Sequence, residues 1–253
     1  MIILSLIEGW EKADLSIALY SLPMKIIEVL MVLAWFFLNS VLPILSNYFK
    51  DDKLEEINNL LKNSFKFLFW FSIYILFLWV LFRDNIIKLI ATPDYLDRNL
   101  HIYTSSDAFL IVLFVLLFYF ISAIFNYIFI ASKHEKTLLN INIFITIFNI
   151  VWNIILIPKF SFIWSAIVTL ISQIFLFILW YYYSRKIVKF DIDLFYVLKI
   201  LLISICLYWL WLYLTINFSI SNILDILVYW SLLSSIYLIY FLYINNKLKF
   251  KNI

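Results

Sequence analysis

The sequence predicts an all-α, polytopic membrane helix bundle, and three observations support this fold class. Of the 253 residues, 66% are hydrophobic and 14% are charged, whereas a soluble domain averages about 45–50% apolar and about 25% charged residues. Mean hydropathy is +1.01. The apolar residues form long runs between charged breaks, and most runs reach the roughly 20 residues that a helix needs to cross a bilayer. We therefore expect most of the chain to lie in lipid.

Reading these runs in order predicts about seven full spans plus the end of an eighth. The full spans are 16–48, 64–82, 104–132, 137–157, 162–184, 194–215 and 222–245. The first is too long for one straight span and contains Pro23 and Pro43, so we expect a bent or tilted helix with a cytoplasmic extension. Residues 1–8 are apolar but too short to cross, and they lack the basic flank of a signal peptide. We interpret them as the end of a preceding span.

Two segments between the spans are predicted to lie at the membrane surfaces. The segment from Asp51 to Lys66 mixes both charge signs, which is typical of an amphipathic helix on a membrane surface. The stretch 86–90 is apolar around one lysine and precedes Pro93. We expect it to lie along the outer interface.

Lysine and arginine in the loops predict the topology. Cytoplasmic loops of membrane proteins are enriched in these two residues. One set of alternate loops and the C-terminal tail holds twelve of them, against five in the opposite set. The richer set comprises Lys50, Lys53, Lys62, Lys66, Lys133, Lys136, Arg185, Lys186, Lys189, Lys247, Lys249 and Lys251. We therefore expect this set, including the C-terminus, to be cytoplasmic.

Composition and spacing exclude several kinds of chemistry. The two histidines, His101 and His134, have no neighbour at metal-ligand spacing, and Cys206 is the single cysteine. Gly9 is the single glycine, which excludes a glycine-rich loop that cradles phosphate. No nucleophile elbow or metal-binding helix motif occurs. We therefore expect no enzyme activity, no cofactor or metal, and no nucleic acid partner.

Lys25 and Glu28 form the one pair of opposite charges deep in an apolar run. Three residues apart on a helix, they lie on one face and are close enough to pair. Charges inside a membrane span commonly mark a substrate or ion pathway. The alternative is that Lys25 extends to the outer interface and Glu28 accompanies it.

Asn149 and Asn153 lie four residues apart, on one face of an otherwise apolar run that ends at Pro158. Their amides must meet another helix or a water-filled cavity. One alternative is that they join helices through hydrogen bonds, with Ser172 and Gln173 of the next span as partners. The other is that they line a substrate pathway.

Four stretches, in the same order, resemble the C-terminal half of the polysaccharide (lipid-linked oligosaccharide) transporter family, within the multidrug/oligosaccharidyl-lipid/polysaccharide exporter superfamily. The resemblance covers residues 1 to about 186. In one departure, Trp164 stands where the family has glycine. The four stretches are Ala18 to Lys25 with its Tyr-Ser pair, Val41 to Ser46, Ile130 to Lys136, and Phe148 to Lys159 continuing into Ala166 to Ser172.

The resemblance implies one lobe of a two-lobe flippase in the plasma (inner) membrane. It implies export of an undecaprenyl-pyrophosphate-linked oligosaccharide by alternating access, for cell-surface polysaccharide or lipopolysaccharide biosynthesis. The substrate-binding residues that follow are Tyr20, Lys25, Glu28, Asn149 and Asn153. Because family members have two lobes, we expect the N-terminal lobe to come from a separate or truncated chain.

The whole chain, 1–253, is expected to form a single transmembrane domain. Within it, 1–15 is the remnant of a preceding span and an outer loop, 16–186 comprises the family-like spans, and 187–253 adds two further spans and a cytoplasmic tail.

Three other functions stay open. The first is a cation-coupled multidrug exporter lobe, for which Glu28 is the candidate carboxylate. The second is a structural or assembly subunit of a membrane complex. The third, an embedded glycan polymerase or acyltransferase, has only Arg83, Arg98 and His101 in its largest outer loop.

Overall fold

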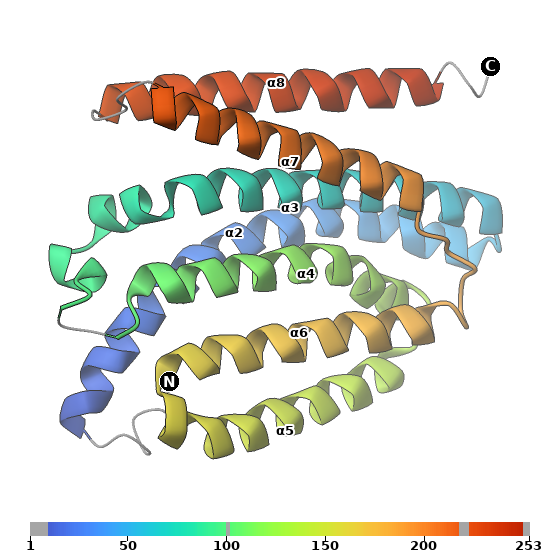
Figure 1. The fold of residues 1–253 in the computed structure, drawn as a ribbon. Coiled ribbons are helices and arrows are strands. Elements are labelled where there is room, and N and C mark those ends of the chain that lie inside the picture. The colour runs from blue at the N-terminus through green and yellow to red at the C-terminus, as the bar shows by residue number, and fades with distance from the viewer. Residues whose placement is uncertain (1–9, 100–101, 218–222, 250–253) are drawn as a thin grey trace.

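The computed structural model describes residues 10–99, 102–217 and 223–249, and this part of the chain is all helix and loop (Figure 1). The expected all-α class is therefore confirmed, while residues 1–8, expected to end a preceding span, lie outside the described residues. The elements are α2 (Trp10–Lys50), α3 (Leu54–Ile90), η1 (Pro93–Leu96), α4 (Ser105–Ala131), α5 (Glu135–Phe160), α6 (Phe162–Ser184), α7 (Leu194–Asn217) and α8 (Ile223–Lys249).

Six of these helices, α2 to α7, are long and apolar enough to cross a membrane in their described parts. Helix α8 contributes a shorter apolar stretch, Trp230–Ile244. Each expected full span thus corresponds to one helix. The chain is a multi-pass membrane protein.

Helix α3 is longer than the sequence predicted, because it absorbs both segments expected at the membrane surfaces. Ile57, Leu61 and Phe65 are buried and continue the stripe of apolar residues of the span at helical spacing. At the other end, Ile87 is fully buried on the same helix. No proline or glycine interrupts Leu54–Ile90, so nothing ends the helix where the charged residues begin.

Helix α4 forms the centre of the bundle. It packs against α2, α3 and α6, and most of its residues are buried. Helix α5 packs chiefly on α6. Helices α7 and α8 lie against α3 (Figure 1), where Trp70 stacks on Phe241 with ring centroids 3.9 Å apart.

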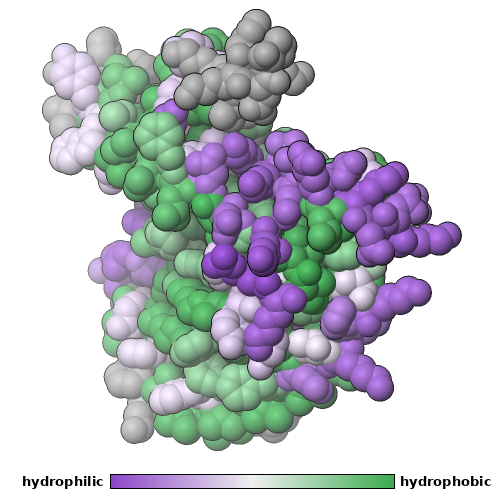
Figure 2. Space-filling view, turned by 90° about the vertical axis from the view of Figure 1, so that its right-hand side faces the viewer, coloured by the Kyte–Doolittle hydropathy of each residue, from purple (hydrophilic) through white to green (hydrophobic). Residues whose placement is uncertain are grey.

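The helix connections that are rich in lysine and arginine lie at one end of the bundle. The α2–α3, α4–α5 and α6–α7 connections all occur there (Figure 1). Figure 2 views the molecule from this end and shows hydrophilic side chains gathered over it. The charged loops that the sequence assigned to one side of the membrane are therefore brought together in space.

Candidate functional site

Lys25 and Glu28 lie on the exposed face of α2. Both side chains are exposed, as are Val29, Val32 and Phe36 further along the same face. No ion pair joins Lys25 to Glu28 among the contacts of the described residues. The expected pair is therefore two neighbouring, separately exposed charges.

The depth of these charges follows from the contacts of α2 with α4. The Ser105 hydroxyl donates to the Leu19 carbonyl at 2.7 Å, so Leu19 lies level with the first residue of α4. Lys25 and Glu28 are then about 9 Å and about 14 Å further along α2, at about 1.5 Å per residue, and these lengths are the largest possible depths because α2 is inclined to α4 at this end (Figure 1). Helix α4, with 27 residues, is about 40 Å long.

A hydrocarbon layer of about 30 Å centred on α4 begins about 5 Å below the end of that helix. Lys25 therefore lies at the edge of the layer, and Glu28 at most about 9 Å inside it. The long side chain of Lys25 can reach the interface from this depth, but the shorter side chain of Glu28 cannot. The exposed carboxylate of Glu28 therefore needs a non-lipid neighbour.

Tyr20 is buried on a different face of α2, against α6. Its hydroxyl lies 3.3 Å from Thr169 Oγ1, and Ser16 Oγ lies 3.3 Å from Ser161 Oγ. These contacts hold the N-terminal part of α2 on the start of α6. The structure therefore does not place Tyr20 beside Lys25 and Glu28 on the exposed face.

Asn149 and Asn153 form a hydrogen-bonded group between α5 and α6. Asn149 Nδ2 donates to Ser172 Oγ at 3.0 Å, and Asn153 Nδ2 donates to Asn149 Oδ1 at 2.9 Å. Asn153 is buried, and its Oδ1 has no hydrogen-bond partner in the structure. One expected partner, Ser172, is thus found. The other, Gln173, donates instead to Ser122 of α4 at 2.9 Å.

The candidate residues therefore fall into three groups. Lys25 and Glu28 are on the free face of α2, whereas Asn149 and Asn153 bond within the lobe on a helix that packs chiefly on α6. Tyr20 belongs to the contact between α2 and α6.

A cavity of about 220 Å³ lies between α2, α4 and α6, and sequence reasoning did not identify it. Its walls include Trp35 and Asn39 of α2, Asn126 and Tyr127 of α4, and Trp180 of α6. The Tyr127 hydroxyl donates to Asn39 Oδ1 at 2.6 Å. The one signal in the sequence is that Glu28, Val32, Trp35 and Asn39 follow helical spacing on one face of α2.

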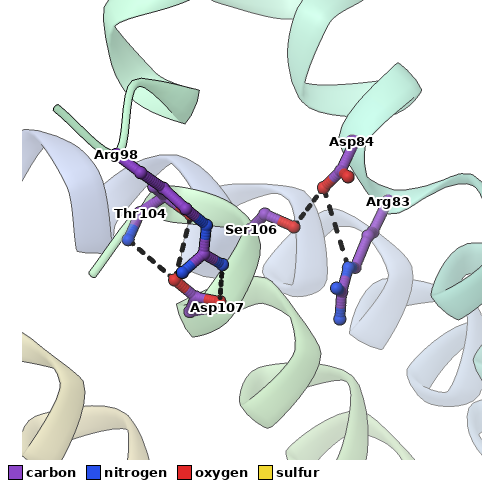
Figure 3. A network of polar contacts seen from close by, with 6 residues as sticks. All are labelled: Arg83, Asp84, Arg98, Thr104, Ser106 and Asp107. Carbon is purple, nitrogen blue, oxygen red and sulfur yellow. Dashed lines mark hydrogen bonds and ion pairs between the residues drawn. The ribbon is translucent and has the colours of Figure 1, made fainter. Parts of the chain in front are cut away.

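The loop between α3 and α4 lies at the opposite end of the bundle from the lysine-rich connections (Figure 1), and a polar network holds it in place (Figure 3). Arg98 Nη2 donates to Asp107 Oδ1 at 2.8 Å, and the backbone amide of Thr104 donates to Asp107 Oδ2 at 2.9 Å. Ser106 donates to Asp84, which also lies 3.7 Å from Arg83 Nε. Asp107 thus completes a capping box at the start of α4.

Within the described residues, no group of three or more His, Cys, Asp or Glu side chains is placed to hold a metal ion.

The chain is similar to known proteins in sequence and in fold. The family model described as MatE matches residues 1–155. No curated protein matches. A solved structure titled "Lipid II flippase MurJ, inward closed conformation" matches with a TM-score of 0.70 and 20% sequence identity. The match covers 94% of this chain and 49% of that one, so the chain spans about half the length of that flippase and shares its fold over that half.

Proposed function

This chain belongs to the MatE family, and from that premise we propose that it is the C-terminal lobe of a lipid-linked glycan flippase. The family lies in the multidrug/oligosaccharidyl-lipid/polysaccharide exporter superfamily, so the chain is a transporter protein rather than an enzyme. The proposed substrate is an undecaprenyl-pyrophosphate-linked oligosaccharide, exported by alternating access for cell-surface polysaccharide biosynthesis.

The observation that carries the proposal is the exposure of Lys25 and Glu28 on a membrane-spanning helix. Placing a charged side chain at the centre of a bilayer costs roughly 2.5–3.5 kcal/mol on insertion scales, and Glu28, between the surface and the centre, carries part of this cost. The free face of α2 is therefore expected to meet a water-filled cavity or a second lobe. Either neighbour fits a two-lobe transporter, in which the substrate site lies at the lobe interface.

In this proposal the Lys25 ammonium attracts the pyrophosphate, because a cation at the cavity wall offsets the charge of the passing head group. Glu28 limits how tightly the anion binds and so favours its release. Tyr20, Asn149 and Asn153 support the site indirectly, because their hydrogen bonds hold α2 and α5 against α6. The lobe then moves as one body.

The proposal includes the arrangement of the complete transporter. A second lobe, on a separate or a continuous chain, faces α2. Residues 16–186 supply the family-like spans, and 187–253 supply two more. The lysine-rich end of the bundle, with the C-terminus, faces the cytoplasm of a plasma (inner) membrane, as the distribution of Lys and Arg favours.

The test is to replace Lys25 in the complete transporter. We expect Lys25→Ala to lower glycan export by about tenfold or more, and Lys25→Glu by more, as for loss of a charge-assisted contact. Lys62→Ala, an exposed lysine at the lysine-rich end of α3, is the matched control and should export normally. Normal export by Lys25→Glu at unchanged protein level would remove Lys25 from the site.

A second candidate function is a cation-coupled multidrug exporter lobe, which the exposed carboxylate of Glu28 favours. In that case Glu28 binds Na⁺ or H⁺, and Glu28→Gln abolishes the dependence of transport on the ion gradient. Transport that keeps its ion dependence in Glu28→Gln counts against this candidate.

A further inference from the structure

Helices α2 and α6 both pack against α4. Near their N-terminal ends they are joined by the Ser16–Ser161 and Tyr20–Thr169 contacts. Further along, the 220 Å³ cavity lies between them, with Trp35 and Asn39 of α2 and Trp180 of α6 in its walls. Figure 1 shows α4 running between the two helices over this part.

The walls of the cavity combine aromatic rings with amides and carry no charged side chain. Four rings, from Trp35, Tyr119, Tyr127 and Trp180, line it together with the amides of Asn39 and Asn126. Trp35 is 51% exposed and stands at the mouth, whereas Trp180 is 7% exposed and forms the back. The bond from Tyr127 fixes the Asn39 amide, leaving its Nδ2 group free to donate.

Two buried polar atoms of the residues in these walls have no hydrogen-bond partner in the structure. They are Asn126 Oδ1, an acceptor, and Trp180 Nε1, a donor. Buried polar groups are normally hydrogen-bonded, and leaving them unpaired costs free energy. Both atoms have almost no exposed surface in this structure, so a ligand with hydroxyl groups recovers this free energy once the two side chains turn toward it. A hydroxyl both donates and accepts, so one kind of ligand group suits both atoms.

This chemistry matches a sugar ring. The C–H faces of a pyranose stack on aromatic side chains, and its hydroxyls pair with amides and indole N–H groups. The absence of charge in the walls argues against a phosphate or a metal ion as the occupant. The volume is below the about 300–1,000 Å³ of pockets for drug-sized ligands, which limits the occupant to about one ring.

The cavity opens on the same face of α2 as Lys25 and Glu28. Glu28, Val32, Trp35 and Asn39 succeed one another at intervals of three or four residues, and Asn39 lies about 21 Å from Lys25 along the helix. We propose that the α2–α4–α6 cavity is a subsite for one sugar residue of the lipid-linked glycan. The inference rests on the proposed function for the identity of the whole substrate.

The test measures sugar binding by the full 253-residue chain in lipid nanodiscs, free of glycoside detergents. Saturation-transfer difference NMR with millimolar glucose, galactose and N-acetylglucosamine detects weak binding through the ring protons. We expect a signal above that of empty nanodiscs for at least one sugar. Trp35→Ala should weaken the binding by about tenfold, as for loss of an aromatic anchor.

Trp209→Ala is the matched control, because it makes the same exchange on α7, where Trp209 is 67% exposed and does not line the cavity. It should bind sugar as the unmodified chain does. Asn126→Leu is a second cavity variant, for use if Trp35→Ala fails to fold. It keeps the size of the side chain and removes the amide, so it should also weaken sugar binding. The proposal is overturned if none of the three sugars binds, or if binding is equal in both folded cavity variants and the control.

Translocation is measured separately in the complete transporter, so that a failure of the flippase proposal can be told apart from a failure of the sugar-subsite proposal. Sugar binding that depends on Trp35, without translocation of any lipid-linked glycan, contradicts the flippase and leaves the subsite. Translocation with unchanged apparent affinity in Trp35→Ala contradicts the subsite and leaves the flippase.

Discussion

At the scale of single residues, the depth of a charged side chain and the face of its helix together decide whether it reaches the membrane interface or needs a polar neighbour inside the membrane. Lys25 alone is compatible with a side chain that reaches the interface. Glu28 lies about one further helical turn into the membrane and is exposed, so its carboxylate needs water or protein beside it. We therefore propose the free face of α2 as the functional face of this lobe.

Single residues also hold helices together, and Asn149 offers a test of this. Because Asn149 bonds Ser172 across to α6, Asn149→Leu should lower the free energy of unfolding by about 0.6–1.7 kcal/mol, the range for hydrogen bonds between membrane helices. Denaturation of the purified chain in mixed micelles measures this loss. The exposed Asn140, on the same helix, provides Asn140→Leu as the control, which should change stability less.

Transport assays separate the two interpretations of this pair. If Asn149 holds helices together, export by Asn149→Leu should fall only in proportion to the folded protein. A loss of about tenfold or more at unchanged protein level would instead make Asn149 a direct substrate contact.

At the scale of elements, the turns between helices use residues other than glycine in left-handed conformations. Lys133 has φ 60° and ends α4. Its amide donates to the Ile130 carbonyl at 3.2 Å, and the His134 amide donates to the Phe129 carbonyl at 2.8 Å. This is a Schellman motif, in which glycine is the preferred residue at this position.

Lys133→Gly should therefore raise the free energy of unfolding by about 1 kcal/mol, because glycine adopts this conformation without steric cost. Thermal unfolding of the purified chain measures the gain. Lys62→Gly makes the same exchange at an exposed position within α3. It should lower the free energy of unfolding by about 1 kcal/mol, because glycine is unfavourable inside a helix. Equal losses in both variants would show that the turn conformation is not strained.

Helix α7 is fastened to α3 by a charged clip. Lys66 Nζ lies 3.1 Å from Asp193 Oδ2, and the Tyr196 hydroxyl donates to the Lys66 carbonyl at 2.9 Å. Burial raises the pKa of Asp193, but the Tyr196 amide and the Lys66 ammonium outweigh it and hold the pKa below its usual value. The clip therefore keeps its charge at neutral and mildly acidic pH.

A lowered pKa in the folded state means that the stabilisation is present above the unfolded carboxyl pKa of about 3.9 and is lost as the pH falls through the folded value. Asp193→Asn should remove it at neutral pH and speed hydrogen exchange at the start of α7. Asp191→Asn, whose partner Arg185 is exposed, should leave that exchange unchanged. Unchanged exchange in Asp193→Asn would contradict the clip.

The helices could largely be predicted from the sequence because long apolar runs have few alternatives in lipid. The ends of the helices could not be predicted. The charged residues in 54–66 and 84–88 look like breaks in the sequence, but α3 continues through both segments because Ile57 and Ile87 are buried there. Lys25 and Glu28 were identifiable as charges in a span. The cavity was not, because its walls come from three helices whose relative rotation only the packing determines.

At the scale of the whole molecule, the fold is that of about half of a solved flippase. Helix α2 buries one side on α4 and leaves the charged side uncovered, as expected for a lobe whose substrate site forms against a second lobe. Alternating access requires the two lobes to move relative to each other, so one lobe alone has nothing to move against. We therefore propose that this chain transports only together with a partner lobe.

The most direct test is reconstitution of the 253-residue chain in liposomes that contain a fluorescent undecaprenyl-pyrophosphate-linked oligosaccharide. Movement across the bilayer is followed by quenching of the fluorophore from outside. We predict no movement above that of protein-free liposomes with this chain alone, and movement when an N-terminal lobe is supplied, lost again in Lys25→Glu. Movement by this chain unaided, or movement with both lobes that ignores Lys25→Glu, would contradict the account.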